Sequence, residues 1–191
     1  MLTRESLYNL ETYAQARTAF RAKVMAHKKL RLVALGAHAS IHFEDQLTMH
    51  YQVQEMLRLE RIFEPERIQE ELDVYNPLIP DGSNWKATLM FEYPDAEERK
   101  AALAGLVGVE KATYVQVAEF ARVTPFANED LDRTTAAKTS AVHFLRFELT
   151  PEMAAAAKGG APIRVGVDHP HYKAETTVSK ATRESLAADL A

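Results

Sequence analysis

The sequence contains no cysteine among its 191 residues. This absence excludes disulfide bonds, a thiol nucleophile, zinc sites built on thiolates, and iron–sulfur clusters held by cysteine. The chain also lacks a run of about 18 apolar residues, which a membrane-spanning helix needs. Its first residues show no basic segment followed by an apolar core, which a signal peptide has. We therefore expect a cytoplasmic protein without membrane contact, in which any redox role depends on another metal, a cofactor or a partner.

A strong excess of charge is absent too. The formal net charge is -4, with 47% hydrophobic and 26% charged residues, which are ordinary values for a globular chain. Slight acidity argues against nucleic acid as a partner, because phosphate binding usually needs a basic surface. The basic cluster from Lys23 to Arg31 leaves a weaker nucleic-acid hypothesis open, although a solvated helix end also explains it. The length favours a single domain over residues 1–191.

Helical and strand periodicities alternate along the chain. Spacings of three and four residues, with capping signals, predict helices over residues 3–30, 46–63, 66–75, 95–106, 150–158 and 182–190. Alternation predicts strands over residues 31–35, 39–44, 84–93, 113–123, 139–149, 162–167 and 174–178. The polar segment 126–138 is predicted to be helical or loose. Nucleotide-binding glycine loops are absent, so we expect an α+β fold with a mixed, largely antiparallel sheet and helices packed on it.

One carboxylate lies on or beside an apolar helix face. The predicted helix 46–63 has a broad apolar stripe formed by Met49, Gln52, Val53, Met56, Leu59 and Phe63. Glu55 borders this stripe, and a buried carboxylate is costly unless it is paired, protonated or bound to metal. Two interpretations stay open. Glu55 forms a salt bridge with Arg58 or another arginine, or it serves a buried site as a metal ligand or proton carrier.

A metal site is one hypothesis for the polar residues near Glu55 in the sequence. His42 and Glu44 point to the same side of the predicted strand 39–44, and with Glu55 they would suit iron, manganese or zinc. His143 lies on the apolar face of its strand, where it is either a hydrogen-bonded core histidine or an alternative ligand. The di-iron Glu-x-x-His pairs, the HExxH motif and the GxSxG motif are all absent. The sequence therefore names no catalytic residue.

A proline-bounded loop is the second candidate site. The segment 76–83 contains Pro77 and Pro80, which restrict the backbone, and Asp81 precedes a glycine in a turn. The following strand places Asn84 and Lys86 on one polar face. This face is either simply exposed or lines a pocket. We therefore interpret five residues as a ligand-binding or partner-binding loop: Asn76, Pro77, Asp81, Asn84 and Lys86.

Three long strings carry a family resemblance: FEDQLTMHYQVQEMLRLERIF, IQEELDVYNPLIPDGSNWKATLMFEY and KTSAVHFLRFELTPEM. They resemble an uncharacterised bacterial family catalogued as domain of unknown function 3501. The resemblance spans nearly the whole chain and brings no established activity. Genes of that family often lie near those of rubrerythrin-like and iron–sulfur proteins, which implies a redox or oxidative-stress setting.

Two hypotheses of different classes follow. The first is an accessory or adaptor protein of a redox system that acts through a rubrerythrin-like or iron–sulfur partner, docking through the loop at residues 76–84 and nearby acidic surface. The alternative is a metal-dependent or ligand-binding enzyme that uses His42, Glu44 and Glu55, or His143. Without cysteine, the protein is not itself the thiol or cluster component of such a system.

Overall fold

The computed structural model describes residues 1–129, 133–135 and 137–191. These residues form two compact units. The helical unit comprises residues 1–30 and 44–80, and the sheet unit comprises residues 31–43 and 81–191. The chain therefore passes between the units three times. The single domain expected over residues 1–191 stays a prediction, and each unit is described by itself.

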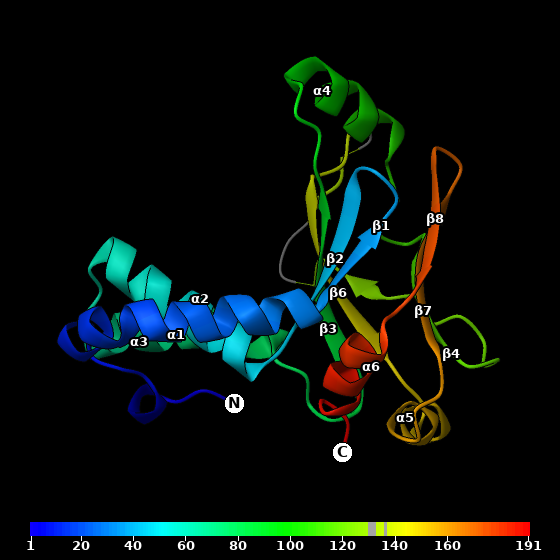
Figure 1. Ribbon diagram of the computed structural model, residues 1–191. Coiled ribbons are helices and arrows are strands. Elements are labelled where there is room, and N and C mark those ends of the chain that lie inside the picture. Colours follow the sequence, from blue (N-terminus) through cyan, green and yellow to red (C-terminus); the bar gives the residue numbers. More distant parts are fainter. Residues whose placement is uncertain (130–132, 136) are drawn as a thin grey trace. The chain divides into compact units, whose positions relative to one another are not determined.

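Three helices make up most of the helical unit (Figure 1). They are α1 (Leu10–Leu30), α2 (Gln46–Glu60) and α3 (Pro65–Tyr75), with short 3-10 turns η1 (Arg4–Ser6) and η2 (Asn76–Leu78). Asp45 caps α2 by accepting a hydrogen bond from the Thr48 amide, and Arg61 ends the helix in the left-handed region with φ 54°. Side chains from α2, α3, the turn between them and the N-terminal segment form a hydrophobic core cluster: Leu2, Met49, Val53, Leu57, Ile62 and Leu72.

The prediction of a buried apolar stripe on α2 is wrong for two of its residues. Leu59 and Phe63 are 64% and 69% exposed. The buried face instead follows Met49, Val53 and Leu57 at intervals of four residues. Leu59 lies two positions beyond Leu57 and so on the opposite side of the helix. Phe63 was expected in the same helix, but α2 ends at Glu60 and the turn at Arg61 redirects the chain.

The amide side chains of buried Gln54 and partly buried Asn76 bind the N-terminal segment, where the sequence predicted a continuous helix from residue 3. Asn76 accepts from the Leu2 amide at 2.8 Å and donates to the Leu2 carbonyl at 3.0 Å. Gln54 makes the same pair with Tyr8, at 2.6 and 3.2 Å. These contacts bind backbone groups that a helix would use internally. The regular helix α1 accordingly begins at Leu10.

The described residues of the sheet unit form two sheets and three helices (Figure 1). The strands are β1 (Leu32–Leu35), β2 (Ala39–Glu44), β3 (Asn84–Phe91), β4 (Thr113–Val117), β5 (Phe126–Ala127), β6 (Val142–Glu148), β7 (Ile163–His169) and β8 (Tyr172–Thr177). The helices are α4 (Ala96–Gly105), α5 (Pro151–Lys158) and α6 (Lys180–Ala187). One sheet has the order β1-β2-β3-β6-β5 and the other the order β4-β7-β8. The final residue of β2, Glu44, belongs to the helical unit.

One hydrophobic core joins the two sheets with α5 and α6. On β3 the side chains of Trp85, Ala87, Leu89 and Phe91 are buried, as the alternation predicts. The pairs β1–β2, β3–β6, β5–β6, β4–β7 and β7–β8 are antiparallel. The expected α+β class with largely antiparallel sheets is therefore confirmed.

Two predicted segments of the sheet unit need correction. The strand expected over residues 113–123 ends at Val117, where Ala118 takes a positive φ of 45° and turns the chain. The polar segment 126–138 begins with the short strand β5, and its residues 130–132 and 136 lie outside the described part. No helix of the described chain is long and apolar enough to cross a membrane.

Candidate functional site

Glu55 lies in an ion-pair cluster of the helical unit. Its carboxylate accepts two hydrogen bonds from Arg17, both 2.8 Å long, and one of 2.7 Å from the Tyr13 hydroxyl. Arg58 adds donors at 3.3 and 3.1 Å from the next turn of α2. The salt-bridge interpretation is thus confirmed for Arg58, and Arg17 of α1 is a second partner.

The electrostatics of this cluster favour an ionised carboxylate. The hydrogen bonds from Arg17 lower the pKa of Glu55 far below its ordinary value, against the opposing effect of burial. Burial raises the pKa of Tyr13, and the hydrogen bond to Glu55 raises it further. A carboxylate held so strongly in its charged form is poorly suited to carry a proton near neutral pH. Its hydrogen bonds to Tyr13 and Arg17 link α2 to α1.

The other proposed metal ligands lie on strands. His42 lies on β2 within hydrogen-bond distance of the Ser40 hydroxyl, at 3.2 Å, and Glu44 is 8% exposed. The described residues contain no group of three or more histidines and carboxylates that could hold a metal ion. The metal hypothesis for His42, Glu44, Glu55 and His143 stays a prediction, and this geometry gives it no support.

His143 is a buried histidine whose two ring nitrogens both have protein partners. Asn128 accepts from the Phe144 amide through Oδ1, so its Nδ2 donates to His143 Nδ1 at 3.0 Å. Nε2 lies 3.0 Å from the Ser140 carbonyl, which can only accept, so this nitrogen carries the proton. Burial lowers the pKa of His143. The ring is therefore a neutral core histidine, and its nitrogens are engaged within the protein.

The proline-bounded loop uses its polar side chains internally. Asn84 is fully buried and donates to Asp81 at 2.8 Å and to Glu148 of β6 at 3.0 Å. Lys86 pairs in register with Arg146, and burial, followed by the charge of Arg146, lowers its pKa. Pro77 is exposed. Of the five residues expected to bind a ligand or partner, Asn76 and Asn84 thus stabilise the fold.

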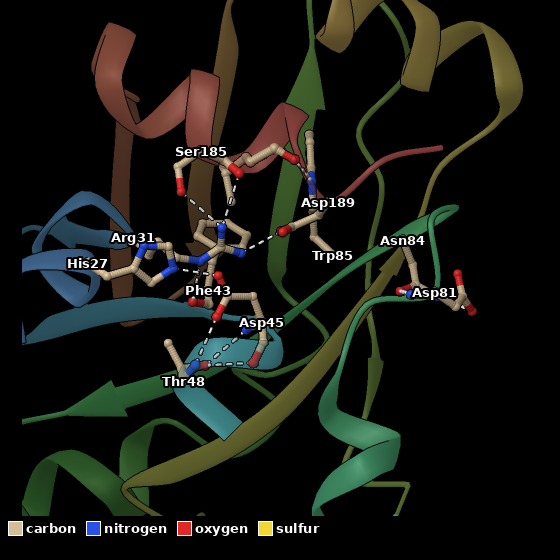
Figure 2. A network of polar contacts seen from close by, with 11 residues as sticks. His27, Arg31, Phe43, Asp45, Thr48, Asp81, Asn84, Trp85, Ser185 and Asp189 are labelled. Carbon is tan, nitrogen blue, oxygen red and sulfur yellow. Dashed lines mark hydrogen bonds and ion pairs between the residues drawn. The ribbon is translucent and has the colours of Figure 1, made fainter. Parts of the chain in front are cut away.

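Arg31 forms a buried network that the sequence did not reveal. Its side chain is 2% exposed, and Nε donates to the Phe43 carbonyl at 3.0 Å. Figure 2 shows the guanidinium directed at Ser185 and Asp189, in and just after α6. Nη1 donates to the carbonyl and hydroxyl of Ser185 at 3.1 and 3.0 Å, and Nη2 forms an ion pair with Asp189. The interaction joins residues 158 positions apart, so no local pattern indicates it.

The segment 59–74 of the helical unit is acidic and carries exposed apolar side chains, and we call its exposed side chains the 59–74 surface. Five large apolar side chains of the described residues are more than half exposed, and Leu59, Phe63 and Val74 are three of them. The segment carries six carboxylates and two arginines. Burial raises the pKa of Glu71, as do the charges of Glu60 and Glu70. The charge of Arg67 opposes this effect, so the carboxylates of the segment contribute only part of the shift.

Comparisons with known proteins identify relatives of unknown function. The model of the family described as "Protein of unknown function (DUF3501)" matches residues 1–190. A crystal structure of a novel protein of unknown function from Burkholderia pseudomallei K96243 is 52% identical, with a TM-score of 0.94. The match covers 100% of this chain and 99% of that chain. A comparison with curated proteins finds no match. The expected membership is confirmed, and this chain belongs to the DUF3501 family of proteins of unknown function.

Proposed function

We propose that this protein is a cytoplasmic accessory protein that acts by binding a protein partner through the 59–74 surface. The observation that carries the proposal is the exposure of Leu59, Phe63 and Val74 among carboxylates. Large apolar side chains that remain exposed within a polar rim are typical of protein interaction sites. The adjacent charge gives the surface a preferred class of partner.

The partner's surface should be basic and should hold an apolar pocket. Six carboxylates against two arginines favour association with lysines and arginines, and such complementarity mainly increases association rate and specificity. Phe63, at 69% exposure, is the side chain best placed to enter an apolar pocket. Aromatic side chains of this kind commonly supply much of the binding energy at interfaces.

The redox setting of the proposal comes from the family. The gene association of the resembled family implies a rubrerythrin-like or iron–sulfur partner. A chain without cysteine fits the role of accessory protein to such a component, because it has no thiolate with which to hold a cluster. The rival enzyme hypothesis lacks a comparable observation, since Glu55 and His143 already bind protein groups.

Capture from a lysate of the native host, followed by mass spectrometry, tests the proposal. The variants Phe63→Ser and Glu70→Lys change the 59–74 surface at exposed positions. Phe126→Ser and Glu119→Lys make the same changes at exposed positions of the sheet unit and serve as matched controls.

Recovery of a rubrerythrin-like or iron–sulfur protein by the wild type and both controls, but not by the 59–74 variants, is the expected result. Equal recovery by all five proteins would refute the proposal that the partner binds through the 59–74 surface. Failure of the wild type to recover any such protein would refute the redox partner.

A further inference from the structure

The N-terminal segment, residues 2–8, lies against α3 within the helical unit. Leu2 is 4% exposed and belongs to the core cluster of that unit, and Leu7 packs against the same cluster. The residues between these two anchors, 3–6, are exposed. The backbone is extended next to each anchor, at Thr3 and Leu7, and makes a 3-10 turn between them. The segment is therefore held mainly at its two ends.

Two side-chain amides bind the backbone of this segment. Asn76 pairs with the N–H and the carbonyl of Leu2, and Gln54 pairs with those of Tyr8. One side-chain amide carries both a donor and an acceptor, so it matches the N–H and C=O of a peptide residue whatever its side chain. Grooves that bind peptides use such main-chain hydrogen bonds for affinity and side-chain pockets for specificity. Here the pocket for Leu2 supplies the specificity.

The segment fills its groove only in part. A cleft of about 700 Å³ is lined by residues 1–5 and, on α3 and η2, by Gln69, Asp73, Asn76 and Pro77. A second cleft of about 320 Å³ is lined by residues 4, 5 and 7–9 and, on α2 and α3, by Leu57, Pro65 and Ile68. Closely packed protein interiors leave few voids. A peptide that filled these clefts would gain contacts that residues 2–8 do not make.

We propose that this groove binds a short peptide segment of the protein partner, which takes the place of residues 2–8. The inference rests on the proposed function, because α3 belongs both to the groove and to the 59–74 surface. The bound residues define the peptide: a leucine for the pocket of Leu2, and a second apolar side chain five positions later, where Leu7 now packs.

The charges of the groove favour a basic peptide. Among the described residues, Asp73 is the one charged side chain that α2, α3 and η2 contribute to the two clefts. The other charged residues of the lining, Arg4 and Glu5, belong to the segment itself and would leave with it. The empty groove would therefore carry a single negative charge, which agrees with the basic partner proposed above.

Residues 2–8 compete with any such peptide, because they belong to the same chain. A short tether gives a bound segment an effective concentration on the order of millimolar. The groove is open to a peptide only in the fraction of molecules from which the segment has detached. Weakening of the segment's own anchor should therefore increase the affinity for an added peptide.

Fluorescence anisotropy with the full chain and a synthetic peptide of residues 1–9, labelled at its carboxyl end, tests the proposal. Leu2→Ser in the chain removes the anchor of the bound segment and keeps every residue of the groove. Met1→Ser is the matched control, because Met1 is 85% exposed and precedes the anchor. A peptide carrying Leu2→Ser is the control for the ligand, and Asn76→Ala added to the Leu2→Ser chain removes one of the backbone-binding amides.

We expect the peptide to bind the Leu2→Ser chain about tenfold more tightly, or better, than the wild type and Met1→Ser. The Leu2→Ser peptide should bind that chain about tenfold more weakly or worse, because burial of a leucine side chain is lost. Asn76→Ala should also weaken binding. In the wild type, the amides of Leu2 and Tyr8 should exchange hydrogen faster than that of Val53 in α2, because the segment opens without global unfolding.

Failure of the peptide to bind the Leu2→Ser chain at millimolar concentration would overturn the proposal. Equal binding of the Leu2→Ser peptide would also overturn it, as would exchange of the Leu2 and Tyr8 amides as slow as that of Val53. A wild-type dimer that Leu2→Ser abolishes would assign the groove to a second copy of this chain and overturn the partner peptide. The assay contains no partner protein, so its failure is distinguishable from a failed capture through Phe63.

Discussion

Replacement of Arg31 by methionine should strongly destabilise the sheet unit. Methionine keeps most of the apolar volume but removes every donor of the guanidinium. The Asp189 side chain, 9% exposed, then loses an ion-pair partner, and the carbonyls of Phe43 and Ser185 each lose a donor. Removal of one partner from a buried ion pair typically costs about 3–5 kcal/mol. Summing the separate hydrogen bonds would overstate the loss, because they belong to one network.

Urea unfolding followed by Trp85 fluorescence measures this loss. Trp85 is the single tryptophan, and its indole donates to the Leu186 carbonyl of α6 at 2.9 Å, close to the altered network. With an m-value of about 2 kcal/mol per molar, a loss of about 3–5 kcal/mol lowers the midpoint by about 1.5–2.5 M. Such a loss is a large part of the total stability of an ordinary domain.

A double variant separates the loss of the ion-pair attraction from the cost of leaving Asp189 buried without Arg31. In Arg31→Met with Asp189→Leu, neither charge remains, so we expect recovery of at least half of the lost stability. The reasoning fails if the single variant costs less than about 1 kcal/mol. It also fails if the double variant is no more stable than Arg31→Met.

Three further perturbations have defined outcomes. Gly166→Ala should destabilise the protein by about 1–3 kcal/mol, because an added Cβ would lie 2.5 Å from the Tyr114 ring. Thermal unfolding measures this loss, and an unchanged melting temperature would contradict the close packing of Gly166 against Tyr114. The pKa of Glu55 is lowered in the folded protein. Its contribution to the free energy of unfolding is therefore complete above the ordinary pKa of 4.5, and it is lost as pH falls toward the lower pKa of the folded state. Circular dichroism should accordingly show a steeper acid loss of helix stability in the wild type than in Glu55→Gln, and parallel curves would refute this role. Asn76→Ala should destabilise the protein by about 1–3 kcal/mol, because it removes both hydrogen bonds to Leu2. Faster hydrogen exchange of the backbone amides across residues 2–8 is the expected result, and unchanged exchange would contradict the role of Asn76 in holding this segment.

Local patterns predicted those elements whose structure depends on local interactions. The strand at residues 39–44 has the predicted bounds because side chains alternate along it. Thr150 caps α5 as expected, since its hydroxyl accepts from the Met153 amide three residues later. The start of α1 was misplaced because Gln54 and Asn76, distant in sequence, bind the N-terminal backbone.

The candidate sites were predictable only in part, for the same reason. Arg58 was a foreseeable partner of Glu55 because it lies one turn along α2, whereas Arg17 comes from another helix. The buried network of Arg31 with Ser185 and Asp189 depends on three-dimensional packing, because its members lie far apart in the sequence.

The buried pair of Arg31 and Asp189 also constrains when the sheet unit can fold during synthesis on the ribosome. A ribosome synthesises Arg31 long before it reaches Asp189, 158 residues later. Until then the β1–β2 hairpin can form, but burial of Arg31, the residue before β1, would leave a charge without this partner. Completion of the sheet unit must therefore wait for α6 to emerge. A chain interrupted before residue 185 would remain open at this point and accessible to proteases and chaperones.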